Sequence, residues 1–190
     1  SADAFRADAF REGLIAELPN LRAFAVSLCR SPVQADDLVQ DTVLKAWANS
    51  EKFQPGTSLR AWLFTILRNT YYSLYRKSGR EVQDHDGTYS QRLAVSGEQE
   101  GAVAMAEFRE ALAKLSEEHR EALILVGASG LSYEEASEIC GVAIGTVKSR
   151  VNRARARLAE LLGISSIDDL GPDRRALAVV ERSPADTVPT

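Results

Sequence analysis

Hydrophobic positions recur every three or four residues along most of this 190-residue chain, and no stretch shows the strict alternation of a half-buried strand. This periodicity predicts helices throughout and an all-α fold. In the first part of the chain, helices are expected at residues 13–18, 21–29, 32–47 and 58–77. Pro19 and Asn20 are expected to separate the first two, and residues 49–56, which end in Pro55 and Gly56, to form a loop.

After residue 77, glycines, serines and acidic residues replace the periodic pattern, which resumes near residue 103 and ends near residue 162. The sequence therefore predicts two small helical domains joined by a flexible linker. The boundaries expected are 5–77 for the first domain, 78–101 for the linker, 102–163 for the second domain and 164–190 for a flexible tail. Within the tail, residues 173–181 fit a short helix.

The helix expected at residues 32–47 begins with a cap and carries apolar side chains on both faces. Ser31 is a candidate N-cap, with Pro32 at the first helical position and Gln34 three residues after the cap. The inner face is expected to hold Leu38, Val39, Thr42, Val43 and Ala46. The outer face is expected to hold Asp37, Gln40, Asp41 and Leu44, with Trp47 at its edge. A leucine and a tryptophan beside acidic residues favour a partner-protein surface; the alternative is an irregular amphipathic helix.

The helix expected at residues 58–77 combines aromatic and basic side chains on its outer face. The predicted core face holds Leu63, Ile66, Leu67, Thr70 and Leu74. The predicted outer face, at about 100° per residue, holds Thr65, Arg68, Asn69, Tyr72, Tyr75 and Arg76. Aromatic rings stack on unpaired bases, cations bind phosphates and an amide can read a base edge, so this face suits a single strand. The alternative is that the two tyrosines pack under another helix.

The second domain contains the pattern of a helix-turn-helix. Ser132 and Glu135 form a candidate capping box, and Ala136 and Ile139 face inward. Gly141 can end this helix in a left-handed conformation at little cost. A long helix follows the turn, and an earlier helix at residues 117–126 is expected to cover the pair. The alternative is a helical hairpin with a solvated basic face.

The long helix within residues 141–158 carries five basic residues and no acidic one, although the whole chain has a net charge of −4. Its core stripe is predicted to be Val147, Val151, Ala154 and Leu158. Short or polar side chains occupy the opposite face, namely Gly145, Ser149, Asn152, Arg153 and Ala156. Lys148 and Arg155 flank that face on one side and Arg150 and Arg157 on the other. Cations beside a small polar face suit phosphates and base edges in a major groove, so the helix predicts DNA binding.

Composition excludes several other classes of protein. A hydrophobic fraction of 45% suits a globular chain, and no apolar run reaches the roughly 18 residues of a membrane span. Cys29 and Cys140 are expected to be buried free thiols, which suits the cytoplasm. An enzyme is disfavoured because His85 and His119 lie in the linker and on a polar helix start, and neither cysteine has a ligand or base pattern nearby. No catalytic residue, metal site or cofactor is expected.

Three motifs, in this order, resemble the extracytoplasmic-function (ECF) sigma factors, which are promoter-specificity subunits of bacterial RNA polymerase. DDLVQDTVLKAW at residues 36–47 resembles the polymerase-binding helix of region two, and SLRAWLFTILRNT at residues 58–70 resembles the promoter-melting helix. GVAIGTVKSRVNRARARL at residues 141–158 resembles the DNA reader of region four. The resemblance covers residues 10–162, and the residues of the motifs are similar to those of the EcfG-type general stress-response branch of alphaproteobacteria.

The resemblance implies a cytoplasmic, non-enzymatic transcription factor with three kinds of site. The polymerase-binding residues would be Asp37, Gln40, Asp41, Leu44 and Trp47, on the clamp helices of the largest subunit of the polymerase core. The downstream promoter element would contact Arg68, Asn69, Tyr72, Tyr75 and Arg76, with Asn69 and the loop 53–58 receiving a flipped base. Thr146, Ser149, Asn152 and Arg153 would read the upstream element, while Lys148, Arg150, Arg155 and Arg157 hold phosphates. An anti-sigma protein would bind both domains; no membrane or small-molecule substrate is implied.

Two other classes of protein share parts of this pattern. In the EcfG branch a response regulator carries a sigma-like decoy domain, which binds the anti-sigma protein without binding DNA and has no need of a basic groove-facing helix. A stand-alone helix-turn-helix regulator would need no aromatic-basic helix and no outer face with acidic residues and a leucine.

Overall fold

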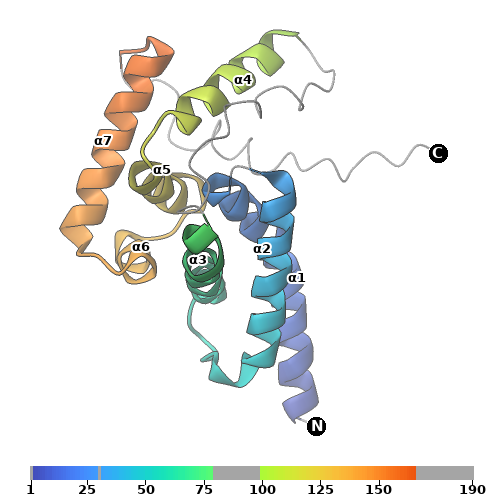
Figure 1. The fold of residues 1–190 in the computed structure, drawn as a ribbon. Helices are drawn as coiled ribbons and strands as arrows, with labels where there is room; N and C mark the ends of the chain where they lie inside the picture. The colour runs from blue at the N-terminus through green and yellow to red at the C-terminus, as the bar shows by residue number, and fades with distance from the viewer. Residues whose placement is uncertain (1, 30, 79–98, 166–190) are drawn as a thin grey trace. The chain divides into compact units, whose positions relative to one another are not determined.

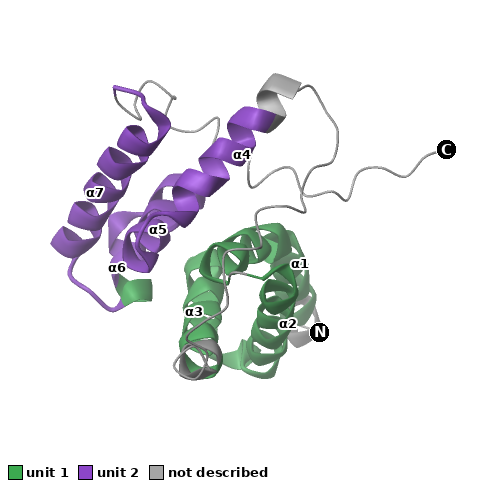
Figure 2. Ribbon diagram, turned by 45° about the horizontal axis from the view of Figure 1, so that its top comes forward, with its two compact units in different colours: residues 1–85, 138–140 green, residues 86–137, 141–190 purple. Residues whose placement is uncertain are grey.

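The computed structural model describes residues 2–29, 31–78 and 99–165, and all the regular elements within these ranges are helical. The chain divides into two compact units, residues 1–85 with 138–140, and residues 86–137 with 141–190 (Figure 2). The all-α prediction is confirmed for the described ranges. Most of the predicted linker and almost all of the predicted tail, including the helix expected at 173–181, lie outside them.

The first unit consists of three helices that pack on one another around one core (Figure 1). These are α1 (Ala2–Leu28), α2 (Pro32–Ala48) and α3 (Leu59–Ser78), with a short 3-10 turn, η1 (Ser50–Lys52), after α2. Phe24 of α1 stacks on Phe64 of α3 with ring centroids 4.7 Å apart, and both rings are fully buried. Around them lie the buried side chains of Leu14, Leu21, Leu28, Ala35, Leu38, Ala46, Leu63 and Leu67.

Helix α1 is continuous, so the break predicted at Pro19 and Asn20 is wrong. A proline inside a helix removes one backbone hydrogen bond and crowds the carbonyl four residues earlier. Pro19 lies on the exposed face, whereas Leu14 and Leu21, on either side of it, are both buried in the same core. Burial on both sides therefore holds the helix together across the proline.

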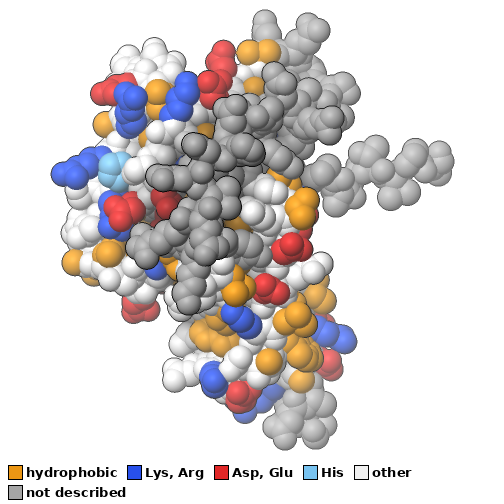
Figure 3. All heavy atoms as spheres, in the orientation of Figure 1, with side chains coloured by type: hydrophobic (Ala, Val, Ile, Leu, Met, Phe, Trp, Pro, Cys, Tyr) orange, Lys and Arg blue, Asp and Glu red, His pale blue; other side chains and the backbone are white. Residues whose placement is uncertain are grey.

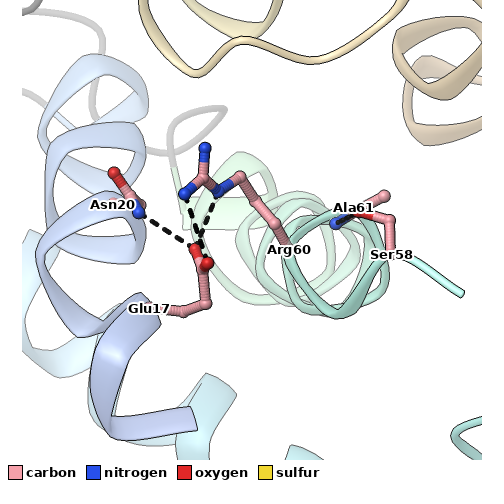
Figure 4. Close-up of polar contacts among 5 residues, drawn as sticks. All are labelled: Glu17, Asn20, Ser58, Arg60 and Ala61. Carbon is pink, nitrogen blue, oxygen red and sulfur yellow. Dashed lines mark hydrogen bonds and ion pairs between the residues drawn. The ribbon is translucent and has the colours of Figure 1, made fainter. Parts of the chain in front are cut away.

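Polar contacts fix α1 against the start of α3 (Figure 4). The guanidinium of Arg60 donates from Nε to Glu17 Oε2 at 2.9 Å and from a terminal nitrogen to Oε1 at 3.2 Å. Asn20 Nδ2 donates to the same Oε2 at 3.0 Å. Ser58 caps α3, since its Oγ accepts from the backbone N–H of Ala61 at 3.1 Å. A two-pronged arginine–carboxylate contact sets orientation as well as distance, so it defines how α3 leaves the loop.

The start of α2 follows the prediction, because the Ser31 side chain caps the helix and Pro32 is its first residue. On the predicted inner face, Leu38, Thr42 and Ala46 are buried, and Val39 and Val43 are half-buried. The loop expected at residues 49–56 contains the η1 turn. On the predicted core face of α3, Leu63, Leu67 and Thr70 are buried, Ile66 is half-buried and Leu74 is 49% exposed.

The second unit contains α4 (Gln99–Ala113), α5 (Glu117–Leu123), a π-helical turn η2 (Ile124–Ala128), α6 (Tyr133–Cys140) without its last three residues, and α7 (Ile144–Leu162). Its core includes the buried side chains of Ala111, Leu115, Ala122, Leu125, Leu131, Ala136, Val147, Val151, Ala154 and Leu158. The helix predicted at 117–126 is α-helical only to Leu123, after which Ser129 N–H donates to Ile124 O at 2.8 Å, five residues back. Helix α4 begins at Gln99, inside the predicted linker.

The predicted boundaries of the helix-turn-helix are present. Ser132 Oγ accepts from Glu135 N–H at 3.0 Å, and a Glu135 carboxylate oxygen accepts from Ser132 N–H at 2.9 Å, which completes the capping box. Gly141 ends α6 with φ of 65°, in the left-handed region. Its N–H donates to Ser137 O at 2.9 Å. This closed turn fixes where α7 begins.

Both cysteines are buried free thiols, as predicted. Burial raises the pKa of Cys29 to about 11, because the thiolate would lose its hydration. A thiol that stays protonated is inert in ordinary conditions, so Cys29 serves the core of the first unit.

Candidate nucleic-acid interface

Helix α7 has one fully buried face and one exposed face, in the positions that the periodicity predicts. Val147, Val151, Ala154 and Leu158 are at most 1% exposed. On the opposite face Gly145, Thr146, Asn152, Arg153 and Ala156 are exposed, and Ser149 is half-buried. Small and polar side chains at the surface let the helix backbone approach another molecule closely, which is what a helix in a major groove requires.

The cations along α7 differ in what they contact. Lys148 is exposed, and its Nζ lies 5.4 Å from the centre of the Tyr133 ring, a cation–π geometry. Arg157 is exposed and pairs with Glu160 at 3.0 Å on the same helix. Arg150 pairs with Glu118 of α5 at 3.3 Å, and only 19% of its side chain is exposed. Arg150 therefore links α7 to α5, whereas Lys148 and Arg157 are exposed on the surface of α7.

Helix α3 presents the second cluster of predicted DNA-binding residues. Asn69 is exposed. The guanidinium carbon of Arg68 lies 4.5 Å from the centre of the Tyr72 ring, and that ring meets Tyr71 edge-on at 5.2 Å. Tyr72 is half-buried, so it keeps some accessible surface while packing against its neighbours. The side chains of Tyr75 and Arg76 lie outside the described part of the chain.

Beside Asn69 lies an open cavity of about 460 Å³ between α2, η1 and α3. Its lining residues are Lys45, Asn49, Lys52, Trp62, Ile66, Asn69, Thr70 and Ser73. Lys45 Nζ donates to Thr70 Oγ1 at 3.1 Å, and Lys52 Nζ donates to Asn49 Oδ1 at 2.7 Å. The lining holds two cations, an aromatic wall and no carboxylate, which suits an anionic ligand with a flat ring.

Of the residues predicted for the downstream element, Asn69 is the one that lines this cavity. The sequence prediction did not include the other lining residues; Asn49 and Lys52 come from the end of α2 and from η1, and the loop 53–58 supplies none of the lining. Lys45 follows Leu44 in α2, and a rotation of about 100° per residue turns it away from the outer face. That rotation could have predicted the face of α2 on which Lys45 lies. The position of Lys52 could not be predicted in this way, because it depends on the path of the loop.

The outer face of α2 is exposed, as predicted, and holds large apolar side chains among polar ones. Leu44 is 68% exposed and Trp47 is 50% exposed. Asp37 and Gln40 are exposed, and Asp41 is half-buried. Val33, which the sequence reasoning did not include, extends this face with 65% exposure. Hydrophobic side chains lie next to acidic ones over α2 (Figure 3), an arrangement typical of a protein-binding surface.

Two other kinds of site are absent from the described residues. No group of three or more His, Cys, Asp or Glu side chains there could hold a metal ion. None of the described helices combines the length and apolar character needed to cross a membrane.

Sequence comparison matches each unit to a known family. The Sigma-70 region 2 family matches residues 14–81, and the Sigma-70, region 4 family matches residues 105–158. ECF RNA polymerase sigma factor EcfG of Rhodopseudomonas palustris (strain TIE-1) is 54% identical over 173 residues, which cover 91% of this chain and 96% of that protein. RNA polymerase sigma factor CarQ of Myxococcus xanthus is 28% identical over 82% of this chain and 90% of that protein.

Solved structures are similar over most of the chain. The sigma factor RpoE in complex with the anti-sigma factor NepR, from Bartonella quintana, is 55% identical, with a TM-score of 0.71 and coverage of 83% of this chain and 98% of that one. CnrH in complex with the cytosolic domain of CnrY is 28% identical, with a TM-score of 0.57 and coverage of 86% and 96%. The PhyRSL-NepR complex from Sphingomonas sp. Fr1 is 25% identical, with a TM-score of 0.58 and coverage of 80% and 87%.

The matches appear in the order that the three motifs predicted, and each covers the unit in which the corresponding surface lies. With the EcfG protein aligned over almost its whole length, they are too extensive for a stand-alone helix-turn-helix regulator. This chain belongs to the extracytoplasmic-function RNA polymerase sigma factors and is of the EcfG type.

Proposed function

We propose that this sigma factor holds promoter DNA at two places while bound to core RNA polymerase. Helix α7 contacts the upstream element, and the α3 face with its adjoining cavity contacts the opened downstream element. The outer face of α2 binds the polymerase. The observation that carries the DNA-binding part is α7 itself, in which a fully buried stripe lies opposite an exposed polar and cationic face.

At the upstream element, Thr146, Ser149, Asn152 and Arg153 read base edges. Lys148, Arg155 and Arg157 contact phosphates on either side of the groove. Arg150 is a phosphate contact as well, and it has to share its guanidinium with Glu118, 3.3 Å away. Arginine donates two hydrogen bonds to guanine and asparagine pairs with adenine, so these side chains have the donors and acceptors for base reading.

At the downstream element, the cavity beside Asn69 takes one unpaired base. Its volume of about 460 Å³ and its openness to solvent suit a single nucleotide. Asn69 supplies an amide for the base edge, and Arg68, Tyr72, Tyr75 and Arg76 hold the adjoining strand. Stacking and charge bind single strands with little dependence on sequence, so the amide supplies the preference for one base.

The outer face of α2 docks on the largest polymerase subunit through Leu44 and Trp47, with Asp37, Gln40 and Asp41 beside them. Exposed apolar side chains lose unfavourable hydration when a partner covers them. The sigma factor works in the cytoplasm, where the polymerase acts, and it supplies binding energy and no chemistry of its own.

An anti-sigma protein controls access to these surfaces. RpoE and CnrH, both similar to this chain, were solved in complex with the anti-sigma factor NepR and with the cytosolic domain of CnrY. The chain is 55% identical to RpoE, so a partner of the NepR kind is expected, and its removal connects the chain to the general stress response. To prevent initiation, the inhibitor has to cover at least one of three surfaces: the outer face of α2, the α3 face with its cavity, or α7.

A decoy that binds the anti-sigma protein without binding DNA is the second candidate, since PhyRSL bound to NepR is also similar to this chain. The exposed cations and base-reading side chains of α7 favour a DNA-binding sigma factor. In vitro transcription separates the two. Core polymerase and sheared genomic DNA from an alphaproteobacterium, with and without the chain, should give RNA 5′ ends that appear only when the chain is added. A chain that binds a NepR protein and gives no new 5′ ends would be a decoy.

A further inference from the structure

Phe10, near the start of α1, is the centre of an aromatic cluster at one end of the first unit. Its ring centroid lies 6.2 Å from that of Trp47, 5.9 Å from Phe53 and 6.1 Å from Trp62. Phe53 and Trp62 also contact each other, at 5.5 Å. Tilted and edge-on pairs at these distances are favourable. Phe10 thus contacts α2, the loop after η1 and α3 at once.

Two of these partners belong to the proposed sites. Trp62 forms a wall of the cavity beside Asn69, and Trp47 lies half-exposed on the outer face of α2. Phe53 ends η1, only one residue after Lys52 of the cavity lining. Phe10 itself lies outside the region 2 family match, which begins at residue 14. The cluster therefore depends on a side chain that the matched region does not include.

The backbone between η1 and α3 is held by short-range hydrogen bonds and by the packing of its rings. Its hydrogen bonds are local, with Phe53 N–H donating to Ser50 O at 3.2 Å and Thr57 Oγ1 to Gln54 O at 2.7 Å. Gly56, in the left-handed region with φ of 89°, bends the chain in open space, since no atom lies within 4 Å of the position that a Cβ would take there. Ring packing on Phe10 joins the Phe53 end of the loop to α1, while the Arg60–Glu17 contact joins α1 to the start of α3 at the other end.

We infer that Phe10 is a positioning residue for the single-strand cavity: it holds Trp62 and the Phe53 loop in the arrangement that receives an unpaired base. Phe10 does not line the cavity and acts through these two rings. The inference rests on the proposed role of the cavity in promoter opening. It adds a requirement for an aromatic ring at position 10, since an aliphatic side chain of similar size cannot make the same ring contacts.

The position of Trp62 can be tested on the free chain by fluorescence. The chain has two tryptophans, so Trp47→Phe leaves Trp62 as the single emitter and keeps an aromatic ring in the cluster. In that background, Phe10→Leu should increase acrylamide quenching of Trp62, whereas Phe10→Tyr should not. Phe24→Leu is the matched control, because Phe24 belongs to the separate pair with Phe64 in the core. Its quenching should stay unchanged even where its thermal stability falls.

The effect on promoter opening is measured with holoenzyme made from core polymerase and the full chain with its native Trp47. On a promoter used by the unchanged chain, Phe10→Leu should reduce permanganate reactivity of the opened thymines by roughly three- to tenfold, the equivalent of one or two ring contacts. Because Phe10 also contacts Trp47 of the proposed polymerase-binding face, opening is compared at saturating core polymerase. Affinity for upstream duplex DNA should stay the same, and Phe10→Tyr should restore opening.

The two measurements separate failure of the inference from failure of the proposed function. The inference would be overturned if Phe10→Leu changed neither the quenching of Trp62 in the Trp47→Phe background nor promoter opening with native Trp47. It would also be overturned if Phe10→Leu reduced promoter opening no more than Phe24→Leu does. If the unchanged chain opens no promoter, the proposed function fails, and the quenching series still decides whether Phe10 positions Trp62.

Discussion

At the scale of single residues, the α7 cations divide by the contacts that they already make. Arg150 and Arg157 pair with Glu118 and Glu160, while within the described part of the chain Arg153 makes no ion pair and is exposed. A guanidinium whose donors are unused can form the two-pronged contact with a base that gives sequence preference. Arg153 is therefore the residue of α7 for which we expect the strongest effect on base preference.

Arg153→Ala should lower affinity for the preferred upstream duplex by about 1–3 kcal/mol and reduce the difference between that duplex and a scrambled one. Arg157→Ala should weaken binding to both duplexes alike and reduce the slope of log affinity against log salt by about one. Fluorescence anisotropy with both duplexes over a range of salt measures these effects. Uniform weakening by both variants would show that Arg153 contacts only the backbone.

The Cys29 thiol gives a prediction for alkaline pH. Its pKa rises from 9.0 to about 11 in the folded chain. Folding thus favours the protonated thiol. Its contribution to the free energy of unfolding is complete below pH 9.0 and is lost as the pH rises from there to about 11. A pKa difference of about two units corresponds to roughly 2–3 kcal/mol in the free energy of unfolding. Urea unfolding of the unchanged chain and of Cys29→Ala, compared at both ends of this range, should show a smaller alkaline loss in the variant. Equal losses would mean that the thiolate is tolerated.

Residue faces were predictable from the sequence where one helix alone decides them, and residue contacts were not. The core stripe of α7 follows from a period of 3.6 residues, and each of its four predicted positions is buried. The cavity beside Asn69 needs Lys45, Lys52 and Trp62 from three different segments, so no local pattern reveals it. Leu74 was misplaced for a related reason: its position on the stripe was correct, but the neighbouring helices leave it 49% exposed.

At the scale of elements, glycine or proline predicted the end of a helix correctly where no buried side chains favoured a continuous helix. Gly141 ends α6 in the left-handed conformation as predicted, and no atom lies within 4 Å of an added Cβ. Pro19 failed as a breaker because α1 buries Leu14 and Leu21 on both sides of it. Burying such side chains offsets much of the roughly 3 kcal/mol that an interior proline costs. The sequence alone does not show whether the free energy gained by this burial is larger than the cost of the proline.

Gly141→Ala should destabilise the second unit by about 1–2 kcal/mol, since the space is free and the cost comes from the backbone conformation. Gly141→Asn should cost less, because asparagine tolerates this region. Gly145→Ala, in the helical first turn of α7 and also without neighbours, is the matched control and should not destabilise. Urea titrations followed by circular dichroism compare the three. A loss in Gly145→Ala as large as in Gly141→Ala would contradict the backbone explanation.

Leu44→Asp should abolish binding to core polymerase while leaving the helix content of the chain unchanged. Leu44 is 68% exposed, so a carboxylate there meets water in the free chain and would be buried only by a partner. Ile15→Asp on α1, at a residue 57% exposed, is the matched control and should bind normally. Co-migration with core polymerase on a sizing column, with circular dichroism of both variants, tests this. Normal binding by Leu44→Asp would remove the outer face of α2 from the polymerase interface.

At the scale of the whole molecule, the sequence predicted the division into two helical units, and the family matches at 14–81 and 105–158 fall one in each, apart from residues 138–140. This level was accessible because periodicity stops in a stretch rich in glycine and acidic residues. The two DNA contacts proposed for this chain would reinforce each other, since binding at one raises the effective concentration at the other. Each contact can therefore be weak alone while the pair selects a promoter.

The central claim is that one chain holds a promoter at two places, and footprinting of the holoenzyme on a promoter from which it initiates tests this most directly. The unchanged chain should protect the upstream element from cleavage and make downstream thymines reactive to permanganate. Arg153→Ala should weaken the upstream protection, and Asn69→Ala should reduce thymine reactivity while the protection remains. If Asn69→Ala opens the promoter normally and Arg153→Ala leaves the protection unchanged, the two-place account is wrong.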